Sequence, residues 1–487
     1  MRSPSRFLGA LLLVLGTAGA PHAACAAQDG DAPAREDEGL RAAREVAERA
    51  EQAAADALRA EEAARRGRRR ALEDLVRAQE DLLTRARDAA DAGEVARTEE
   101  RLRALYRDLG VAASAMAFPP RVPGPAARAT AGHVEMRFPP FIARKENAAS
   151  PAVAAALDWL ARHQGTAGNW DSDGYGSQCR GVACLGGGGP LFDVGLTGLA
   201  TLPFLGAGET HKTPTHGAPV RNALKYLKAV QDAEGCFGPR TSNHFVYNHA
   251  IATLAMAEGY GLTQSPLFKG SAQSGIDFIL QAQNPYLAWR YGVKPQDNDT
   301  SVTGWMVLAL RAGVGAGLTV DDGAFRGAVA WLDKVTEPEY GRVGYTARGN
   351  GPARPQERMD RFPVDRSESL TAVGILARVL CGAPKDDESL RKGVALCRRC
   401  LPAWDESSGS IDMYYWYFGT MAMLQVRGDD RTAWNGSLQG ALLPHQRGPA
   451  DGCANGSWDP VDPWGAEGGR IYSTAIATMA LEASLAY

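Results

Sequence analysis

The stretch Gln231-Asp232-Ala233-Glu234-Gly235-Cys236-Phe237 is one copy of a pattern that decides the fold of this 487-residue chain. In each copy a predicted helix ends in Gln, a short loop follows, and Gly stands two positions before an aromatic residue. Further copies run from Gln164 to Trp170 and from Gln446 to Trp458, and each is followed by a small, apolar segment. One helix pair cannot bury its own apolar face, so a recurrence at roughly 45–70 residues indicates stacked or ring-closed helical units.

The segment 150–487 contains twelve candidate helices that alternate between two kinds of composition. The first helix of each pair is amphipathic, with apolar residues at intervals of three and four. The second is apolar nearly all round and rich in Gly, Ala and Thr, as in 245–256 and 470–482. A helix that is apolar on every side is buried. Six amphipathic helices outside and six apolar ones inside predict a closed double ring; an open solenoid would need polar capping repeats, which neither end shows.

The N-terminal segment 1–27 has the pattern of an export signal. Arg2 and Arg6 precede an apolar run, and small residues flank Cys25 as at a cleavage site. The apolar run is shorter than a stable membrane span needs, although an uncleaved anchor is an alternative. Lipid anchoring through Cys25 is less favoured, because His22 stands where bacterial lipoproteins usually have Leu. We therefore expect a periplasmic or secreted protein.

Two further segments separate the signal from the repeats. Residues 28–111 are rich in Ala, Arg and Glu, which are strong helix formers, and predict a coiled-coil hairpin or a single solvated stalk helix. This helix could mediate self-association. Residues 112–149 are rich in Pro, Gly and Ala and are expected to be a linker.

The charge balance limits the kinds of partner. The formal net charge is −3, whereas nucleic-acid binding requires a basic surface. Every long apolar segment of the repeats is interrupted by Asp, Arg or Gly, so no integral membrane span is expected. A small molecule or a glycan is the expected ligand class.

The repeats resemble those of the prenyltransferase/squalene oxidase superfamily, which includes squalene–hopene cyclases and protein prenyltransferase β-subunits. The Gln…Gly-x-Trp copies resemble the cyclase repeat, and the segments 297–310 and 469–482 resemble inner helices of these proteins. The resemblance covers about residues 150–487. It implies an all-α fold, an (α/α)6 toroid, which would follow the N-terminal helix or hairpin.

The catalytic motifs of this superfamily are altered here. Cyclases have Asp-x-Asp-Asp-Thr, whereas this chain has Gln at 296, Asn298 at the proton-donor position, and Asp299. An amide cannot protonate an alkene. At the prenyltransferase zinc positions Asp412 remains, but Tyr414 and Tyr472 replace Cys and His. The thioester motif of a third relative is absent. We therefore expect neither a metal nor a cofactor.

In such a toroid the inner helices all run in the same direction, so their N-termini meet at one rim over the central cavity. Polar and aromatic residues at a rim over an apolar barrel are typical of a small-molecule site. The acid–base candidates there are Asp299, Asp412, His249 and Glu368. The ligand-binding candidates are His244, Asn248, Trp305, Arg366, Tyr414, Tyr415 and Tyr472. Each also has a structural alternative: helix caps for the aspartates, core packing for His249 and the tyrosines, and mutual pairing for Arg366 and Glu368.

Four cysteines fall in loops of repeats that ring closure makes adjacent. They are Cys179, Cys184, Cys236 and Cys453. Because exported proteins tend to oxidise their cysteines, two disulfides are favoured over a Cys₄ zinc site, and the pairing cannot be deduced from sequence.

Three functions remain open at this point. The first is an exported repeat protein that binds a small or polymeric ligand in the toroid cavity without catalysis. The second is an extracytoplasmic lyase or hydrolase acting on a glycan. The third is a divergent terpenoid cyclase. A dry aromatic pocket would favour the cyclase, whereas carboxylates across a wet cleft would favour the glycan enzyme.

Overall fold

The computed structural model describes the repeat region and scattered N-terminal positions. The described residues are 151–485 without 243, 352–353, 355–357, 385–386 and 427, together with 49, 52–53, 75, 79, 82, 93–94, 97–98, 100–101 and 105. The chain divides into two units, residues 1–70 and 71–487. All described positions between 49 and 105 are helical. The expected signal, the linker and most of the stalk lie outside the described residues.

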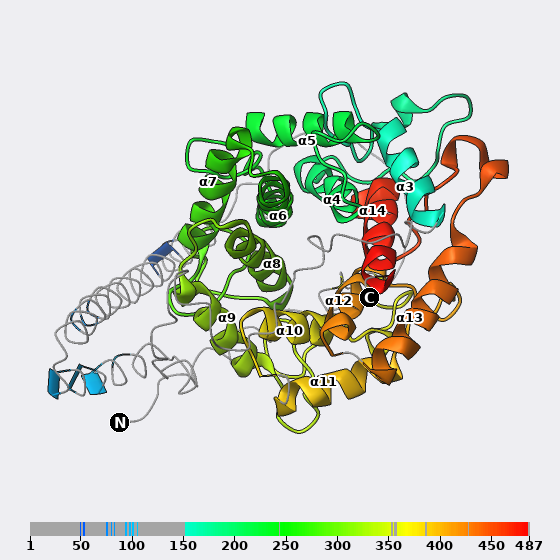
Figure 1. The fold of residues 1–487 in the computed structure, drawn as a ribbon. Helices are drawn as coiled ribbons and strands as arrows, with labels where there is room; N and C mark the ends of the chain where they lie inside the picture. Colours follow the sequence, from blue (N-terminus) through cyan, green and yellow to red (C-terminus); the bar gives the residue numbers. More distant parts are fainter. Residues whose placement is uncertain are drawn as a thin grey trace, which may run out of the picture. The chain divides into compact units, whose positions relative to one another are not determined.

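From Pro151 onward, the described part of the chain forms twelve α-helices that alternate between an outer and an inner layer (Figure 1). The outer helices are α3 (Pro151–Arg162), α5 (Gly217–Ala229), α7 (Pro266–Ala282), α9 (Asp322–Val335), α11 (Glu388–Arg399) and α13 (Asp429–Leu442). The inner helices are α4 (Asp193–Gly206), α6 (Phe245–Thr263), α8 (Thr300–Ala316), α10 (Ser369–Leu380), α12 (Met413–Val426) and α14 (Gly465–Leu485). Short 3₁₀ helices lie in the loops: η4 (Tyr175–Gln178), η6 (Val364–Arg366), η7 (Leu443–His445) and η8 (Pro449–Ala454).

The inner layer closes on itself. Each inner helix packs against the next one along the chain, and α14 packs against both α4 and α3. Figure 1 shows α14 between α4 and α12, with the outer helices around them. This arrangement confirms the expected closed (α/α)6 ring and excludes the alternative of an open solenoid. It is also the fold implied by the resemblance to squalene–hopene cyclases.

The Gln of the repeat pattern joins neighbouring repeats. The Gln283 side-chain amide donates to the carbonyl of Leu287 in its own loop (2.8 Å) and to that of Ala324 at the start of the next outer helix (3.0 Å). Gln446 of the last repeat donates in the same way to Gly456 (2.8 Å) and to Ala152 of α3 (2.7 Å). The last repeat therefore binds the first through the contact that joins consecutive repeats elsewhere.

The aromatic residue of the pattern fixes the loop against both layers. The indole N–H of Trp170 donates to the Leu160 carbonyl at the end of α3 (2.8 Å), and its backbone N–H donates to Thr197 of α4 (3.0 Å). Trp458 and Trp289 make the equivalent pairs of bonds. Trp289 belongs to a copy, Gln283 to Trp289, that the sequence analysis did not identify.

The inner helices approach each other closely because their contact positions are small. A Cβ added at Gly198 would lie 2.9 Å from the backbone of Ala252 on α6, and one at Gly304 would lie 2.4 Å from Val373 on α10. The buried threonines of this layer bond to their own helix, as Thr201 does to the Thr197 carbonyl (2.7 Å). No helix among the described residues is long and apolar enough to cross a membrane.

Candidate functional site at the rim of the inner ring

Three buried aspartates precede inner helices at the rim, two of them directly and Asp462 by three positions. Asp299 precedes α8, Asp412 precedes α12 and Asp462 precedes α14. Their exposed fractions are 0%, 2% and 4%. A buried carboxyl needs hydrogen bonds or an opposite charge, so the partners of each one define its chemistry.

Asp299 caps α8 and also faces the tyrosines of the neighbouring loops. Its Oδ1 accepts the Val302 N–H (2.7 Å), while its Oδ2 accepts the Tyr345 hydroxyl (3.4 Å). The Arg290 Nε lies 3.8 Å from the same Oδ2. Burial raises the pKa of Asp299 to about 7, although the Val302 N–H and Arg290 oppose this shift. A carboxyl with this pKa can donate or accept a proton at neutral pH.

A pair of tyrosine hydroxyls extends from Asp299 toward the surface. The Tyr345 hydroxyl lies 2.7 Å from the Tyr291 hydroxyl, and both side chains are half-buried. The Arg290 guanidinium lies over both rings, 5.5 Å from Tyr291 and 5.6 Å from Tyr345. Such a hydrogen-bonded chain can pass a proton between a buried carboxyl and a ligand.

Asp412 is an ion-pair partner as well as a cap. Its Oδ2 accepts the Arg354 guanidinium (2.6 Å) and the Ser367 hydroxyl (2.8 Å), and its Oδ1 accepts the Tyr415 N–H of α12 (2.9 Å). Asp412 and Arg354 are both almost completely buried. Removing one member of such a pair would leave the other charge uncompensated.

Asp462 lies close enough to Asp412 for the two charges to interact. Its Oδ2 accepts the Met413 N–H (3.1 Å) and the Tyr472 hydroxyl (3.2 Å). Burial, together with the negative charge of Asp412, raises the pKa of Asp462 to about 7. Two adjacent carboxyls with different partners are a typical acid–base arrangement.

Tyr414 lies close enough to Asp299 and Asp412 for their charges to act on its phenol. Its hydroxyl is 2.9 Å from the Ser301 hydroxyl of α8, and its ring centroid is 6.2 Å from that of Trp464. Burial raises the pKa of Tyr414, and the charges of Asp299 and Asp412 add to the effect, so its phenol stays protonated. It can therefore donate a hydrogen bond at any physiological pH.

Both ring nitrogens of His249 form hydrogen bonds within the fold. Its Nδ1 accepts the Phe237 N–H (3.1 Å), and its Nε2–H donates to the Gly275 carbonyl (3.1 Å). Burial lowers the pKa of His249 to about 3. His249 occupies the position that Thr197 fills beside Trp170, so it replaces the threonine of the repeat.

Glu368 and Arg366 do not pair with each other. Glu368 forms an ion pair with Arg342 (2.5 Å) and accepts the Thr371 hydroxyl (2.8 Å). Arg366 lies exposed in η6. Glu368 therefore fixes the preceding loop to α10, and its carboxylate is already occupied.

Among the predicted ligand-binding residues, Tyr415 and Asn248 hold neighbouring elements together. The Tyr415 hydroxyl donates to the Cys400 carbonyl (2.9 Å), and the Tyr415 ring packs edge-on against Trp434 of α13. The Asn248 amide donates to the Leu191 carbonyl (2.8 Å). Both side chains thus donate to backbone carbonyls of neighbouring loops.

The other predicted residues contribute to the rim or to the layer below it. His244 is exposed and its ring lies 5.6 Å from Tyr291. Tyr472 bonds to Asp462, as described above. Trp305 is 3% exposed and stacks on Tyr417 at 5.9 Å, within a buried aromatic layer.

Sequence reasoning missed the residues that complete the site. They are Arg290, Tyr291, Tyr345, Arg354, Asp462 and Trp464. All six lie in loops between an outer and an inner helix. The repeat register gave no signal for them, because Asp462 follows the pattern residue Trp458 by four positions whereas Asp299 follows Trp289 by ten.

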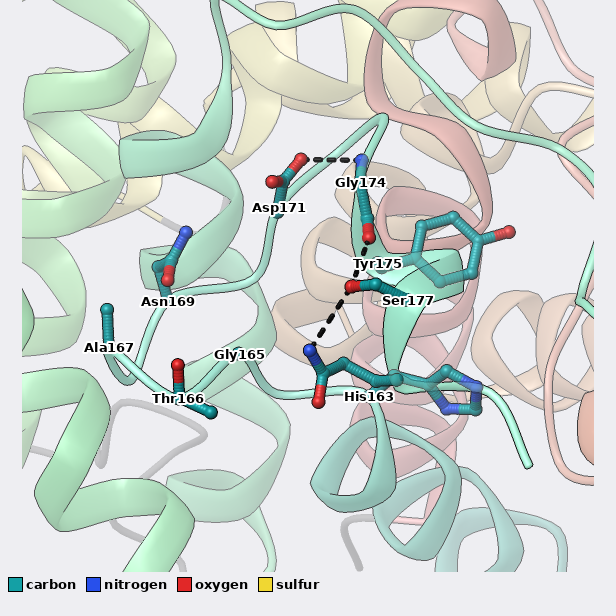
Figure 2. A pocket seen from close by; sticks show the side chains of 10 residues that line it. His163, Gly165, Thr166, Ala167, Asn169, Asp171, Gly174, Tyr175 and Ser177 are labelled. Atoms are coloured by element: carbon teal, nitrogen blue, oxygen red, sulfur yellow. Dashed lines mark hydrogen bonds between the residues drawn. The ribbon is translucent and has the colours of Figure 1, made fainter.

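A separate small pocket lies in the loop of the first repeat (Figure 2). Its volume is about 180 Å³, and its lining runs from His163 to Gln178. Asp171 lines it and accepts the Gly174 N–H (2.6 Å). Asp171, Asp173 and Asp193 have carboxylate oxygens within 4.8 Å of one another. Burial raises the pKa of Asp193 to about 6, while the Ser172 N–H opposes the shift.

Comparison with solved structures finds several similar folds at low identity. The α-1,6-mannanase GH76A of Salegentibacter sp. HEL1_6 is 13% identical, with 69% of this chain and 99% of that chain covered and a TM-score of 0.48. The type II terpene cyclase MstE from Scytonema is 15% identical over 69% and 98%, with a TM-score of 0.43. A novel α-amylase from Clostridium perfringens is 12% identical over 68% and 97%, with a TM-score of 0.46. These likenesses concern the fold alone. No family model matches the chain, and no curated protein matches it.

Proposed function

We propose that the rim binds a hydroxyl-rich ligand of the glycan class and that Asp299 is the general acid–base group of a glycan-active hydrolase or lyase. One observation carries this proposal: a buried carboxyl with a pKa of about 7 lies at the end of a chain of two tyrosine hydroxyls. Acid–base groups are most effective when their pKa lies near the working pH.

The composition of the rim suits a glycan. Tyr291 and Trp464, both half-buried, offer aromatic rings, whose faces pack against the apolar side of a sugar, and the Tyr291 phenol offers a hydrogen-bonding group. Asp462 adds a second carboxyl that is partly protonated near pH 7. Cleavage of a glycosidic bond commonly uses two carboxyl groups, one as the acid.

Alkene protonation has less support. Asn298, at the position of the cyclase acid, is 5% exposed, and its Oδ1 accepts the Ala288 N–H (2.9 Å) and the Asn284 amide (3.0 Å) within the loop. The aromatic layer below the rim packs on itself, since Trp305 lies 5.2 Å from Phe418, which is fully buried. This favours a polar ligand at the mouth over a polyene in the barrel.

The place of action that we propose is outside the cytoplasm. The basic residues and apolar run of the segment 1–27, with small residues around Cys25, support export. We also propose a helical stalk over 28–111 and a linker over 112–149 between the export signal and the repeats. Polymeric glycans are substrates that an exported enzyme meets.

The test is a panel of polysaccharides assayed for reducing-end release and for unsaturated products, using the full chain. Wild type is expected to act on at least one glycan, and Asp299→Asn to lower turnover by about 10²–10⁴-fold while still binding. Asp277→Asn, at an exposed position of α7, is the control. Full activity of Asp299→Asn would refute the acid–base role. Glycan binding by wild type without any product would refute catalysis and leave a binding module.

A further inference from the structure

Three cysteines and one histidine meet where the first and last repeats join. His163 follows the last residue of α3, and Cys179 and Cys184 lie in the loop after it. Cys453 lies in η8 of the last repeat, 290 positions from His163 in sequence. The four residues therefore connect the two ends of the ring.

The distances among these groups fit a tetrahedral metal site. The sulfurs of Cys179, Cys184 and Cys453 lie 3.5, 3.6 and 3.4 Å from the Nε2 of His163. All four ligand atoms lie within 4.8 Å of one another. In a tetrahedral zinc site, Zn–S bonds of about 2.3 Å and Zn–N bonds of about 2.0–2.1 Å place N and S about 3.6 Å apart.

The histidine is held in the tautomer that a metal needs. Its Nδ1–H donates to the Trp159 carbonyl (2.8 Å), which leaves the lone pair of Nε2 directed at the sulfurs. The Trp159 ring stacks on the imidazole at 4.2 Å, and Tyr175 packs edge-on against it at 5.9 Å. Metal-bound histidines typically have such a partner on the second nitrogen. The single lone pair of the His163 Nε2 could accept a hydrogen bond from only one of the three S–H groups. A cation at the centre of the cluster would instead bind all three sulfurs and this nitrogen.

Two N–H groups lie at the cluster. The backbone N–H of Cys184 donates to the Cys179 sulfur (3.2 Å). The indole N–H of Trp159, next to His163, is buried and has no hydrogen-bond partner in the described part of the structure. N–H donors of this kind stabilise the negative charge of metal-bound sulfur.

The expected disulfides agree less well with this geometry. All four candidate cysteines are free thiols in the structure. Cys236 lies outside the cluster, fully buried, with its sulfur 3.9 Å from the Phe237 carbonyl. One disulfide among the remaining three would leave an odd sulfur beside the histidine.

We propose that His163, Cys179, Cys184 and Cys453 bind one Zn²⁺ in a closed, structural Cys₃His site. Four protein ligands leave no position open for a substrate, so the ion has a structural role. The ion would join the first repeat to the last. The 184–189 loop also contacts α14 nearby, where the Arg470 side chain donates to the Leu185 carbonyl (2.7 Å). This site is independent of the proposed glycan function.

The direct test is metal analysis of the full chain, purified without chelators, by inductively coupled plasma mass spectrometry. We expect roughly one zinc per chain. Replacing zinc with Co²⁺ should give the intense visible bands and sulfur-to-cobalt charge-transfer absorption of a tetrahedral thiolate site. A chelator should expose three further thiols to a thiol reagent. These measurements need no variant and no activity assay.

Variants assign the ligands. His163→Asn keeps a side-chain N–H that can replace the Nδ1–H bond to the Trp159 carbonyl but removes the Nε2 ligand, so bound zinc should fall more than about tenfold. Cys453→Ser should have the same effect, whereas Cys381→Ser, at another half-buried cysteine outside the cluster, should keep its zinc. Wild type without stoichiometric zinc, or with a disulfide among the three cysteines by mass spectrometry, would overturn the proposal. So would full zinc content in His163→Asn.

Discussion

Replacing Gln446 with Ala tests whether the last repeat binds the first in solution. The Gln446 amide makes two hydrogen bonds, to the Ala152 carbonyl (2.7 Å) across the joint and to the Gly456 carbonyl (2.8 Å) within its loop. A hydrogen bond of this type contributes about 0.5–1.5 kcal/mol net. The variant should therefore lose about 1–3 kcal/mol of unfolding free energy.

Gln283→Ala is the matched control, because its amide makes the same pair of bonds between consecutive repeats (2.8 and 3.0 Å). Urea unfolding of both variants, followed by circular dichroism at equal protein concentration, compares the two losses. In a closed ring they should agree within about 0.5 kcal/mol. A loss for Gln283→Ala together with a negligible effect of Gln446→Ala would show that the ring does not close there.

Three further predictions concern the buried polar groups. Asp462 has a pKa near 7 when folded, against 3.8 as the ordinary value, so the folded state binds its proton more tightly and stability should fall as pH rises from about 4 to 7. At about 1.4 kcal/mol per pH unit, the free energy of unfolding falls by at most about 4 kcal/mol. Urea unfolding across this pH range should show a weaker pH dependence of stability for Asp462→Asn than for wild type. The same pH dependence in both proteins would contradict the raised pKa. Arg354→Met leaves the Asp412 charge buried and unpaired and should cost about 3–5 kcal/mol in the same assay, more than the double variant Arg354→Met/Asp412→Asn; equal costs would argue against the ion pair. His249→Thr introduces the residue that other repeats have at this position, so glycan turnover should stay within about twofold of wild type. The cavity left by the smaller side chain should lower the free energy of unfolding by about 1–3 kcal/mol. A loss of turnover of more than about tenfold in the folded variant would support a catalytic role for His249.

The ring could be predicted from the sequence because its signals are local and repeated. Amphipathic and all-apolar helices alternate, and both kinds appear where the periodicity placed them. Asp299 and Asp412 at the helix starts were also predictable, as caps and rim residues. The copy containing Trp289 was missed because Leu287 stands where the other copies have Gly two positions before the aromatic residue.

The chemistry of the rim was less accessible because it depends on partners distant in sequence. Asp412 obtains its charge partner from Arg354, 58 positions away, and no local pattern indicates that pairing. For His249 the local sequence and the repeat register point to different places. A histidine near a helix start suggests a rim position, whereas the repeat register places His249 beside Phe237. The cysteines were grouped by loop, but the fourth member of the cluster is His163, at the end of a helix.

The most direct test of the proposed acid–base site is the titration of its carboxyl groups by NMR of protein labelled with ¹³C at the aspartate side chains. We expect resonances with midpoints near 7 for Asp299 and Asp462 and near 6 for Asp193, well above the ordinary value of 3.8. The Asp299→Asn variant should lack one of the two resonances near 7, and Asp277→Asn should keep both. If every aspartate of the wild-type protein titrated below about pH 5, Asp299 would be a helix cap alone and the proposed catalysis would lose its basis.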